Sequence, residues 1–289
     1  MPTLDAVFSR GSFRSHMPFF DGETLLFCRS DDAVQQEFRH GGSLWRRLPR
    51  DRRLREQFKN VPQTVSLTYR SWKLHYCSWK DRQPQRLETG LGPNAIECSP
   101  AFYRENDEVH VSFIGGLPTA KRFVYHLCTM SGPSLEELAP AQQVAPLETS
   151  IGFVSPLYVC FGGRTLLVQE RDSGAQHRVS VPVDHLYRAT FRADDPHSLI
   201  FTGLHKNGEP QTWLFDMKSK ETSQVISDIP VYKSTLFKDQ LITAVKEGDG
   251  IENRQLKSGS YTLEKLTGEA AVQCAEMKKT IELPELQLT

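Results

Sequence analysis

The residues best suited to acid–base chemistry are three carboxylates that each stand ahead of a strand-like segment. They are Glu97, Glu148 and Asp184. Glycoside hydrolysis uses two carboxyl groups, about 5 Å apart in retaining enzymes and about 6.5–9.5 Å apart in inverting ones. The three residues precede their strands by different intervals, which predicts different heights in a common channel. We therefore keep hydrolysis as an alternative and favour a protein without catalytic residues.

Four cations form a second candidate group. If the strands close into a ring, the residues just ahead of each strand start face a central channel, and four of these are His16, Arg70, Arg188 and Lys233. The full set of expected lining residues is Ser15, His16, Tyr69, Arg70, Cys98, Ser99, Val154, Ser155, Tyr187, Arg188, Tyr232 and Lys233. A channel mouth with several cations favours an anion such as a carboxylate or a phosphate. The alternative is that these groups are hydrated or paired across the channel.

A third group lies in a basic segment, residues 41–60, which carries seven basic and two acidic residues. Pro49 interrupts any helix in this segment. We expect an insertion on the rim of the domain, where it is either a solvated turn or a docking patch for an acidic partner or a nucleic-acid backbone. The candidate docking residues are Arg46, Arg47, Arg50, Arg52, Arg53 and Arg55.

The sequence motifs of several other chemistries are missing. There is no GxSxG elbow, no GxxxxGK[ST] loop and no HExxH pair. The six cysteines include no CxxC pair, which fits neither a zinc site nor a compact disulfide framework, so we expect reduced, buried thiols. The nine histidines show no metal-ligand spacing. We expect no cofactor and no metal.

The elements that would position these residues repeat along the chain. A Pro or small residue opens an aromatic-rich strand, and a polar turn and a second apolar strand follow. These anchor residues are Pro18, Pro100, Pro156, Ala189 and Ser234. The turns between the strands contain Asp, Asn and Gly, which tolerate tight turns. The first interval is much longer than the others, which suggests that a further unit lies between, at Val65–Trp79.

Each unit is too long for one hairpin and suits a four-stranded sheet. Such sheets repeated around an axis form a β-propeller, in which neighbouring sheets cover one another's faces. We predict an all-β, single β-propeller domain over residues 1–289 with five or six blades, and a β-sandwich is the runner-up. The strand-like segments LDAVFSR and KKTIELPELQL, near the two termini, are expected to close the ring.

Several segments resemble known propellers. SPAFYRENDEVHVSF resembles the inner strands of five-bladed glycosidases of the arabinanase and xylosidase type, and YHLCTMSGPSLEEL is similar to their outer strands. WLFDMKSKETSQV, with Asp216 heading its turn, resembles the outer hairpin of WD-repeat propellers, and KNGEPQTW is similar to the Asp-box of sialidases. The resemblance implies the fold. In the glycosidases an acid opens the first blade, where this chain has Met17 in SHMPFF, so the catalytic motif is not matched.

Composition narrows the range of partners. The 289 residues include 35 basic and 35 acidic side chains, so a nucleic-acid partner is not expected. No apolar run approaches the roughly 20 residues that span a bilayer, and the N-terminus lacks the apolar core of a secretion signal. This predicts a protein of the cytoplasm or of a larger assembly, without membrane insertion.

The function that we predict is a non-catalytic binding or assembly module that contacts a protein or glycan partner through its face loops. One alternative is a glycoside hydrolase with a degenerate carboxylate site in the central channel. Another is a structural subunit of a bacteriophage tail or virion. The sequence leaves open whether the chain forms a homo-oligomer.

Overall fold

All regular elements in the described part of the chain are β-strands. The computed structural model describes residues 16–39, 64–119, 123–147, 151–162, 165–181, 183, 185–204, 209–229, 231–247, 250–267 and 273–276. Within these ranges no helix has the length and apolar character needed to cross a membrane. The prediction of an all-β chain is confirmed for these residues.

The strands form five antiparallel sheets, which we call blades 1 to 5 in chain order. Blade 1 contains β1 (His16–Phe20), β2 (Thr24–Arg39), β3 (Thr64–Ser78) and β4 (Gln85–Arg86). Blade 2 contains β5 (Ile96–Glu105), β6 (Glu108–Pro118), β7 (Phe123–Gly132) and β8 (Gln142–Leu147). Blade 3 begins with β9 (Ile151–Val154), β10 (Tyr158–Gly162), β11 (Thr165–Glu170) and β12 (Gln176–Ser180). Blade 4 begins with β13 (His185–Phe191), β14 (Ser198–Leu204), β15 (Pro210–Asp216) and β16 (Thr222–Ser227). Blade 5 contains β17 (Tyr232–Phe237), β18 (Gln240–Glu247) and β19 (Gly250–Leu256).

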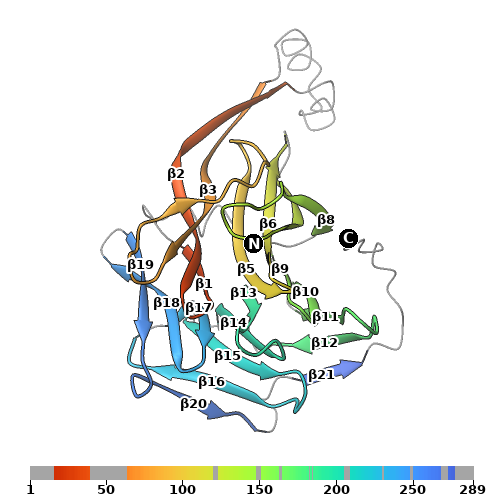
Figure 1. Ribbon diagram of the computed structural model, residues 1–289, viewed down its shortest axis with the longest axis vertical. Coiled ribbons are helices and arrows are strands. Elements are labelled where there is room, and N and C mark those ends of the chain that lie inside the picture. The colour runs from red at the N-terminus through yellow and green to blue at the C-terminus, as the bar shows by residue number, and fades with distance from the viewer. Residues whose placement is uncertain are drawn as a thin grey trace, which may run out of the picture.

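The first strand of each blade is the innermost, and these five strands form a closed circuit. β1 contacts β5, β5 contacts β9, β9 contacts β13, β13 contacts β17, and β17 contacts β1 again. In Figure 1 these strands lie around the middle of the molecule, whereas β8, β12, β19 and β20 lie at its periphery. The chain is a five-bladed β-propeller.

The last two described strands return to earlier blades. β20 (Tyr261–Lys265) pairs with β16 at the outer edge of blade 4, and β21 (Gln273–Glu276) pairs with β12 at the outer edge of blade 3. These two blades therefore have five strands each, and blade 5 has three. The terminal segments that we expected to close the ring lie outside the described residues, as does the basic segment 41–60.

The anchor residues of the sequence repeat mark β-bulges in the inner strands. Register shifts occur between His16 and Phe19, Cys98 and Ala101, Leu186 and Arg188, and Tyr232 and Thr235. Pro18, Pro100 and Ser234 each lie within one of these shifts, and Ala189 directly follows one. A bulge bends its strand and turns side chains to a new direction. The repeat in the sequence thus records a backbone feature of four inner strands.

Two details of the expected repeat are wrong. The segment 65–79 was expected to open a hidden unit, but its residues 65–78 belong to β3, which pairs along the length of β2 inside blade 1. The long first interval is therefore a long hairpin, and the blade count is five. Pro156 does not open an inner strand either, because it lies in the turn between β9 and β10. The inner strand of blade 3 is the short segment IGFV before it, which contains no Pro to signal it.

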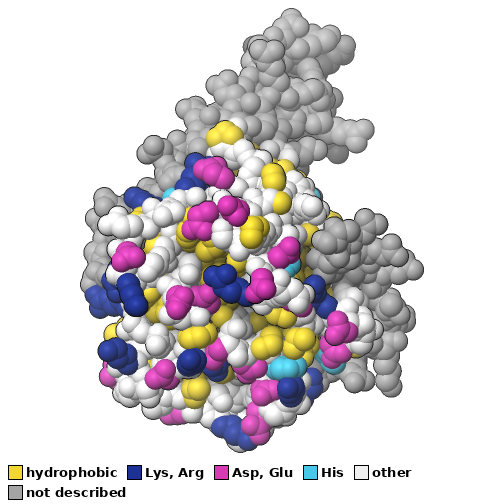
Figure 2. All heavy atoms as spheres, viewed as in Figure 1, with side chains coloured by type: hydrophobic (Ala, Val, Ile, Leu, Met, Phe, Trp, Pro, Cys, Tyr) yellow, Lys and Arg dark blue, Asp and Glu magenta, His cyan; other side chains and the backbone are white. Residues whose placement is uncertain are grey.

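Aromatic side chains from different blades fill the space between the sheets. The largest core cluster includes Phe19 and Trp72 of blade 1, Phe102 of blade 2 and Trp213 of blade 4. The five described cysteines are buried and free, as expected for thiols that act as small hydrophobes. Figure 2 shows basic and acidic side chains interspersed over the face in view, in keeping with the zero net charge.

The seam between blades 1 and 5 joins the first described blade to the last. The rings of Phe20 and Phe237 meet edge to face at 6.0 Å, and the Trp79 indole Nε1 donates a hydrogen bond to Gln255 Oε1 at 3.1 Å. Gly22, in the β1–β2 turn, has φ +104°, and a Cβ atom placed there would lie 2.5 Å from the Phe237 ring. The turn of blade 1 therefore needs glycine for its backbone and for this contact.

We expect the substitution Gly22→Ala to lower the free energy of unfolding by roughly 1–3 kcal/mol, because it adds steric conflict to backbone strain. Gly92→Ala is the matched control, since Gly92 also has a left-handed φ of +88° but no atom within 4 Å of an added Cβ. Denaturant unfolding of both variants measures the difference. Equal losses would contradict a tight seam at Phe237.

Candidate functional site

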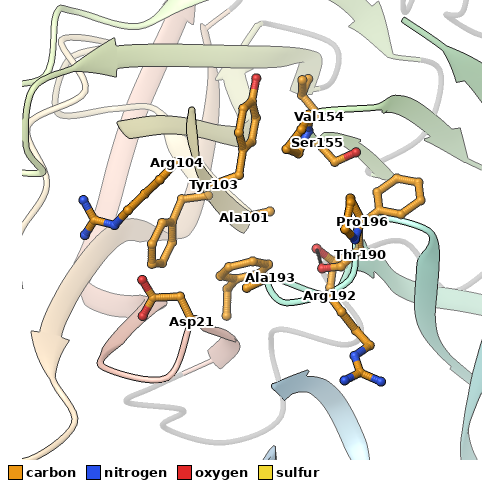
Figure 3. Close-up of a pocket in the computed structure, with 14 residues that line it drawn as sticks. Asp21, Ala101, Tyr103, Arg104, Val154, Ser155, Thr190, Arg192, Ala193 and Pro196 are labelled. Atoms are coloured by element: carbon orange, nitrogen blue, oxygen red, sulfur yellow. Dashed lines mark hydrogen bonds between the residues drawn. The ribbon is translucent and has the colours of Figure 1, made fainter. Parts of the chain in front are cut away.

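A pocket of about 220 Å³ opens where four blades meet, on the side of the ring that carries the turn after each inner strand. We call this side the first-hairpin face. The pocket is lined by Phe19, Asp21, Ala101, Phe102, Tyr103, Arg104, Val154, Ser155, Pro156, Thr190, Phe191, Arg192, Ala193 and Pro196. In Figure 3, Arg104 and Arg192 come from different blades and direct their guanidinium groups away from each other.

Apolar groups make up the interior of the pocket. Phe19, Phe102 and Phe191 are each 2–3% exposed and belong to the large core cluster beneath it. The rings of Phe19 and Phe102 pack at 5.1 Å, and Phe191 stacks on Tyr158 at 5.2 Å. The floor is thus continuous with the core and is fixed by packing between blades.

The charged groups of blade 4 at the rim are held by blade 5. Arg192 donates two hydrogen bonds to the carboxylate of Asp194, at 3.1 and 2.6 Å, and Asp194 Oδ2 also accepts from the Lys238 amide at 2.8 Å. Burial would raise the pKa of Asp194, but these hydrogen bonds hold it below its ordinary value. The rim turn of blade 4 is therefore tied to the β17–β18 turn.

A second clamp joins blades 2 and 3. Arg171 Nη1 donates to the hydroxyl of Tyr103 at 3.1 Å and to the carbonyl oxygens of Ser155 and Pro156 at 3.2 and 3.0 Å. The Tyr103 ring stacks on His110 at 4.9 Å. Tyr103 also lines a neighbouring cavity of about 140 Å³, so the two spaces share this residue.

Among the described residues that line the pocket of about 220 Å³, Asp21 is the one carboxylate. Its Oδ1 accepts hydrogen bonds from the amides of Glu23 and Thr24, at 3.1 and 2.8 Å, so it caps the β1–β2 turn. The lining residues that the structure describes therefore do not supply the pair of carboxyl groups that glycoside hydrolysis requires. In the described ranges there is also no group of three His, Cys, Asp or Glu side chains placed to hold a metal ion.

Two of the four expected channel cations lie at the ring centre, and both are buried. Arg188 is 1% exposed and Lys233 is fully buried. His16 lies on the inner strand β1, but Arg70 lies on β3, two strands away from the axis. The side chains of His16 and Arg70 are outside the described part of the structure. The expected mouth of four cations is thus replaced, as far as the structure describes it, by an interior pair.

Burial dominates the electrostatics of this pair. Desolvation lowers the pKa of Arg188 to about 9, and it lowers the pKa of Lys233 to about 7, with the charge of Arg188 adding to the effect. The neighbouring thiols of Cys28 and Cys98 have raised pKa values, again chiefly because of burial. Lys233 and Ser99 also share a left-handed backbone, with φ values of 53° and 51°, at their bulges.

Glu97, one of the three expected catalytic carboxylates, is part of a buried network between blades 1 and 2. It is 1% exposed, its Oε1 lies 3.4 Å from Lys73 Nζ and accepts from Thr89 Oγ1 at 2.6 Å, and its Oε2 accepts from the Leu74 amide at 3.0 Å. Lys73 also donates to the carbonyl oxygens of Gly92 and Ala95, both at 2.8 Å. Glu97 therefore joins the two blades and does not line the pocket.

The remaining site predictions concern residues that the structure does not describe. These are Glu148 and Asp184, and the six docking arginines Arg46, Arg47, Arg50, Arg52, Arg53 and Arg55. Their roles stay predictions. Sequence reasoning, in turn, missed Tyr103, Arg104 and Arg192, because it looked for functional residues at the start of each inner strand. The sequence feature that could have identified these residues is the polar turn that follows each inner strand.

Comparison with known proteins adds little to this geometry. No protein-family model matches the chain, and no curated protein matches its sequence. A glycosyl hydrolase from Bacteroides ovatus is 11% identical, with a TM-score of 0.44 over 90% of this chain and 89% of that chain. An ACO/RPE65 chimera is also 11% identical, with a TM-score of 0.33 over 75% of this chain and 48% of that chain. The fold rests on the strand pairing itself.

We expect Glu97→Gln to lower the free energy of unfolding by about 3 kcal/mol, because it removes the negative charge that faces the buried ammonium group of Lys73. Glu221→Gln is the control, since Glu221 pairs with Lys265 on the surface, where both are more than half exposed, and such a pair contributes less than about 1 kcal/mol. Denaturant unfolding compares the two. Unchanged stability in Glu97→Gln, with loss of a hydrolytic activity, would contradict the structural role.

We expect the variant Lys233→Met to lose a pH dependence of stability that the natural protein has. The pKa of Lys233 is about 7 in the folded chain and near 10.5 when unfolded. Between these two pH values only the unfolded state holds the proton. The free energy of unfolding should therefore rise by up to about 1.4 kcal/mol for each pH unit above pH 7, and Lys233 should add no such rise below pH 7. Denaturant unfolding at pH 6, 8 and 9.5 measures this. If the free energy of unfolding depends on pH in the same way in the natural protein and in Lys233→Met, the claim that burial lowers the pKa of Lys233 is wrong.

Proposed function

We propose that this propeller is a non-catalytic binding module whose first-hairpin face captures a protein partner by an apolar side chain. The observation that supports this most is the pocket at the meeting point of four blades, with a floor of three phenylalanines and a polar rim. Interfaces between proteins concentrate their binding energy in such places, where an aromatic or aliphatic anchor fills a pocket surrounded by polar groups.

The size of the pocket favours a single side chain as its occupant. At about 220 Å³ it is smaller than the roughly 300–1,000 Å³ of typical small-molecule sites. An extended glycan would need more room, or an exposed aromatic face along which to lie. The Tyr103 ring is already covered on one side by His110, at 4.9 Å.

The rim is organised before any partner arrives. Arg192 is held by Asp194, Tyr103 by Arg171, and Asp21 by the amides of its own turn. Little side-chain entropy would then be lost on binding, which favours affinity. These hydrogen bonds also make the rim groups poorly suited to acid–base catalysis, which requires a group free to exchange a proton with the substrate.

The test begins with selection of a random peptide library on the immobilised protein. Enriched peptides should share an aromatic or large aliphatic residue, and they should lose binding at least tenfold to Ala193→Trp, whose indole would fill the half-buried pocket. Ala175→Trp is the matched control, because Ala175 is exposed in the β11–β12 turn, farther out on the same face. It should bind the peptides as the natural protein does.

Three results would overturn the proposal. The first is a set of peptides that bind Ala193→Trp as well as they bind the natural protein. The second is a glycan array in which specific glycans bind and are displaced by the Ala193→Trp change. The third is turnover of chromogenic glycosides, which would favour the alternative function, with Glu148 and Asp184 as candidate catalytic carboxylates.

A further inference from the structure

We propose that the partner of the first-hairpin face is a protein segment that carries a basic side chain, Lys or Arg, close to its apolar anchor. The anchor fills the pocket of about 220 Å³, and the basic side chain lies in a second cavity beside it, between blades 1 and 2. This inference rests on the proposed function, because it names the chemistry of the partner that the same face captures.

The second cavity, which we call the side cavity, has a volume of about 300 Å³ and opens on the same face. It shares Arg104 with the pocket. The two spaces also meet at the β1–β2 turn, where the amide of Thr24 donates to the carboxylate of Asp21 at 2.8 Å. Thr24 lines the side cavity and Asp21 lines the pocket. One extended segment can therefore place nearby side chains in both spaces.

Two carboxylates line the side cavity from different blades. Asp81 comes from the β3–β4 turn of blade 1, and Glu136 comes from the β7–β8 turn of blade 2. Hydrogen bonds to Glu136, from its own backbone amide and from the side chains of Ser134 and Tyr76, hold its pKa below the ordinary value. Glu136 therefore keeps its negative charge at neutral pH and can pair with a cation.

The turns around the side cavity carry a surplus of negative charge. Residues 21–23, 79–84, 104–108 and 133–141, at the ends of blades 1 and 2 on this face, include eight acidic and three basic residues. The whole chain, in contrast, has equal numbers of acidic and basic residues. A local surplus of one sign steers and selects partners of the opposite sign. The surplus therefore favours a basic partner segment.

The basic residues of these turns offset the two carboxylates only in part. The guanidinium group of Arg82 lies over the Trp79 ring, 4.5 Å from its centroid, and Arg82 does not line the side cavity. Arg104 does line it, and its charge lowers the pKa of Glu136 less than the hydrogen bonds do. The described lining thus contains two carboxylates and one cation, and a Lys or Arg side chain would neutralise the remaining charge.

The form of the lining favours a cationic side chain over a metal ion. In the described ranges, no group of three His, Cys, Asp or Glu side chains is placed to hold a metal, and Asp81 and Glu136 come from separate turns. A long ammonium or guanidinium side chain needs no closed coordination shell, and it can extend from a backbone that is held by its anchor in the pocket.

The peptides selected from the random library are the probes, and fluorescence anisotropy measures their binding. Peptides that bind should carry Lys or Arg close to the apolar residue. Replacing that Lys or Arg by Glu should weaken binding to the natural protein roughly fivefold, and higher salt should reduce the difference. This comparison needs no variant of the protein to fold.

A double variant tests the site of the contact. Asp81→Asn combined with Glu136→Gln should weaken binding of the basic peptides roughly fivefold. The matched control is Asp228→Asn combined with Glu264→Gln, because it makes the same charge change at exposed positions of blade 4, after β16 and on β20. The control protein should bind the peptides as the natural protein does.

The outcomes separate this inference from the proposed function. Suppose that the peptides lose binding to Ala193→Trp but show no preference for Lys or Arg, or bind the Asp81→Asn, Glu136→Gln protein unchanged. The inference of a basic partner would then be wrong, and capture of an apolar side chain would stand. Enrichment of an acidic residue beside the anchor would likewise overturn the inference alone. Peptides that bind Ala193→Trp as well as the natural protein would overturn both.

Discussion

Five inner strands share one axis, and every side chain that they direct toward it must find its partners inside the protein. Apolar and small side chains meet this constraint by packing, as the phenylalanines beneath the face pocket do. Charged side chains meet it only with an acceptor, because water is excluded. Arg188 and Lys233 stand at this point of greatest constraint, and the electrostatics of the ring centre follow from their burial.

The β-bulges in the inner strands redirect side chains locally, and they allow charged side chains to lie at the ring centre. Each shifts the register of an inner strand against its neighbour, and at Ser99 and Lys233 the backbone enters the left-handed region although neither residue is glycine. Non-glycine residues adopt this conformation at an energetic cost, and such strain concentrates at functional sites. The cost is offset by packing between blades, which fixes the direction of these side chains.

The face pocket depends on the same ring through different contacts. Arg192 and Asp194 of blade 4 are tied to blade 5 through Lys238, and Arg171 of blade 3 is tied to Tyr103 of blade 2. Each clamp crosses a boundary between blades, so the shape of the pocket depends on the closure of the ring. In the proposed function, this rim is the surface that surrounds the partner's side chain.

The fold was largely predictable from the sequence, because anchor residues such as Pro18 and Pro100 mark bulges that recur with the blades. The start of blade 3 was predicted wrongly because its inner strand is short and its proline lies in a turn. Strand β3 was taken for a new unit because the β2–β3 hairpin is unusually long. The pairing of β20 and β21 with strands of earlier blades could not be predicted from the residues of these two strands, since pairing between distant segments depends on the closed ring.

The candidate site was predictable only in part. Arg188 and Lys233 were identified from their positions before the anchors, but their burial depends on neighbouring blades and has no signature in the adjacent sequence. Val154 and Ser155 were among the expected lining residues, and they do line the pocket. The other pocket residues at the ends of the inner strands escaped notice, because their convergence arises only when four blades meet.

The most direct test of the central claim, that the packed inner strands enclose the charged side chains at the ring centre, is chemical methylation of the lysines in the folded protein, with mass spectrometry used to locate the modified residues. The account predicts that the fully buried Lys233 stays unmodified until the protein is unfolded, whereas the exposed Lys218 is modified at once. Modification of Lys233 in the folded protein at the rate of Lys218 would contradict it.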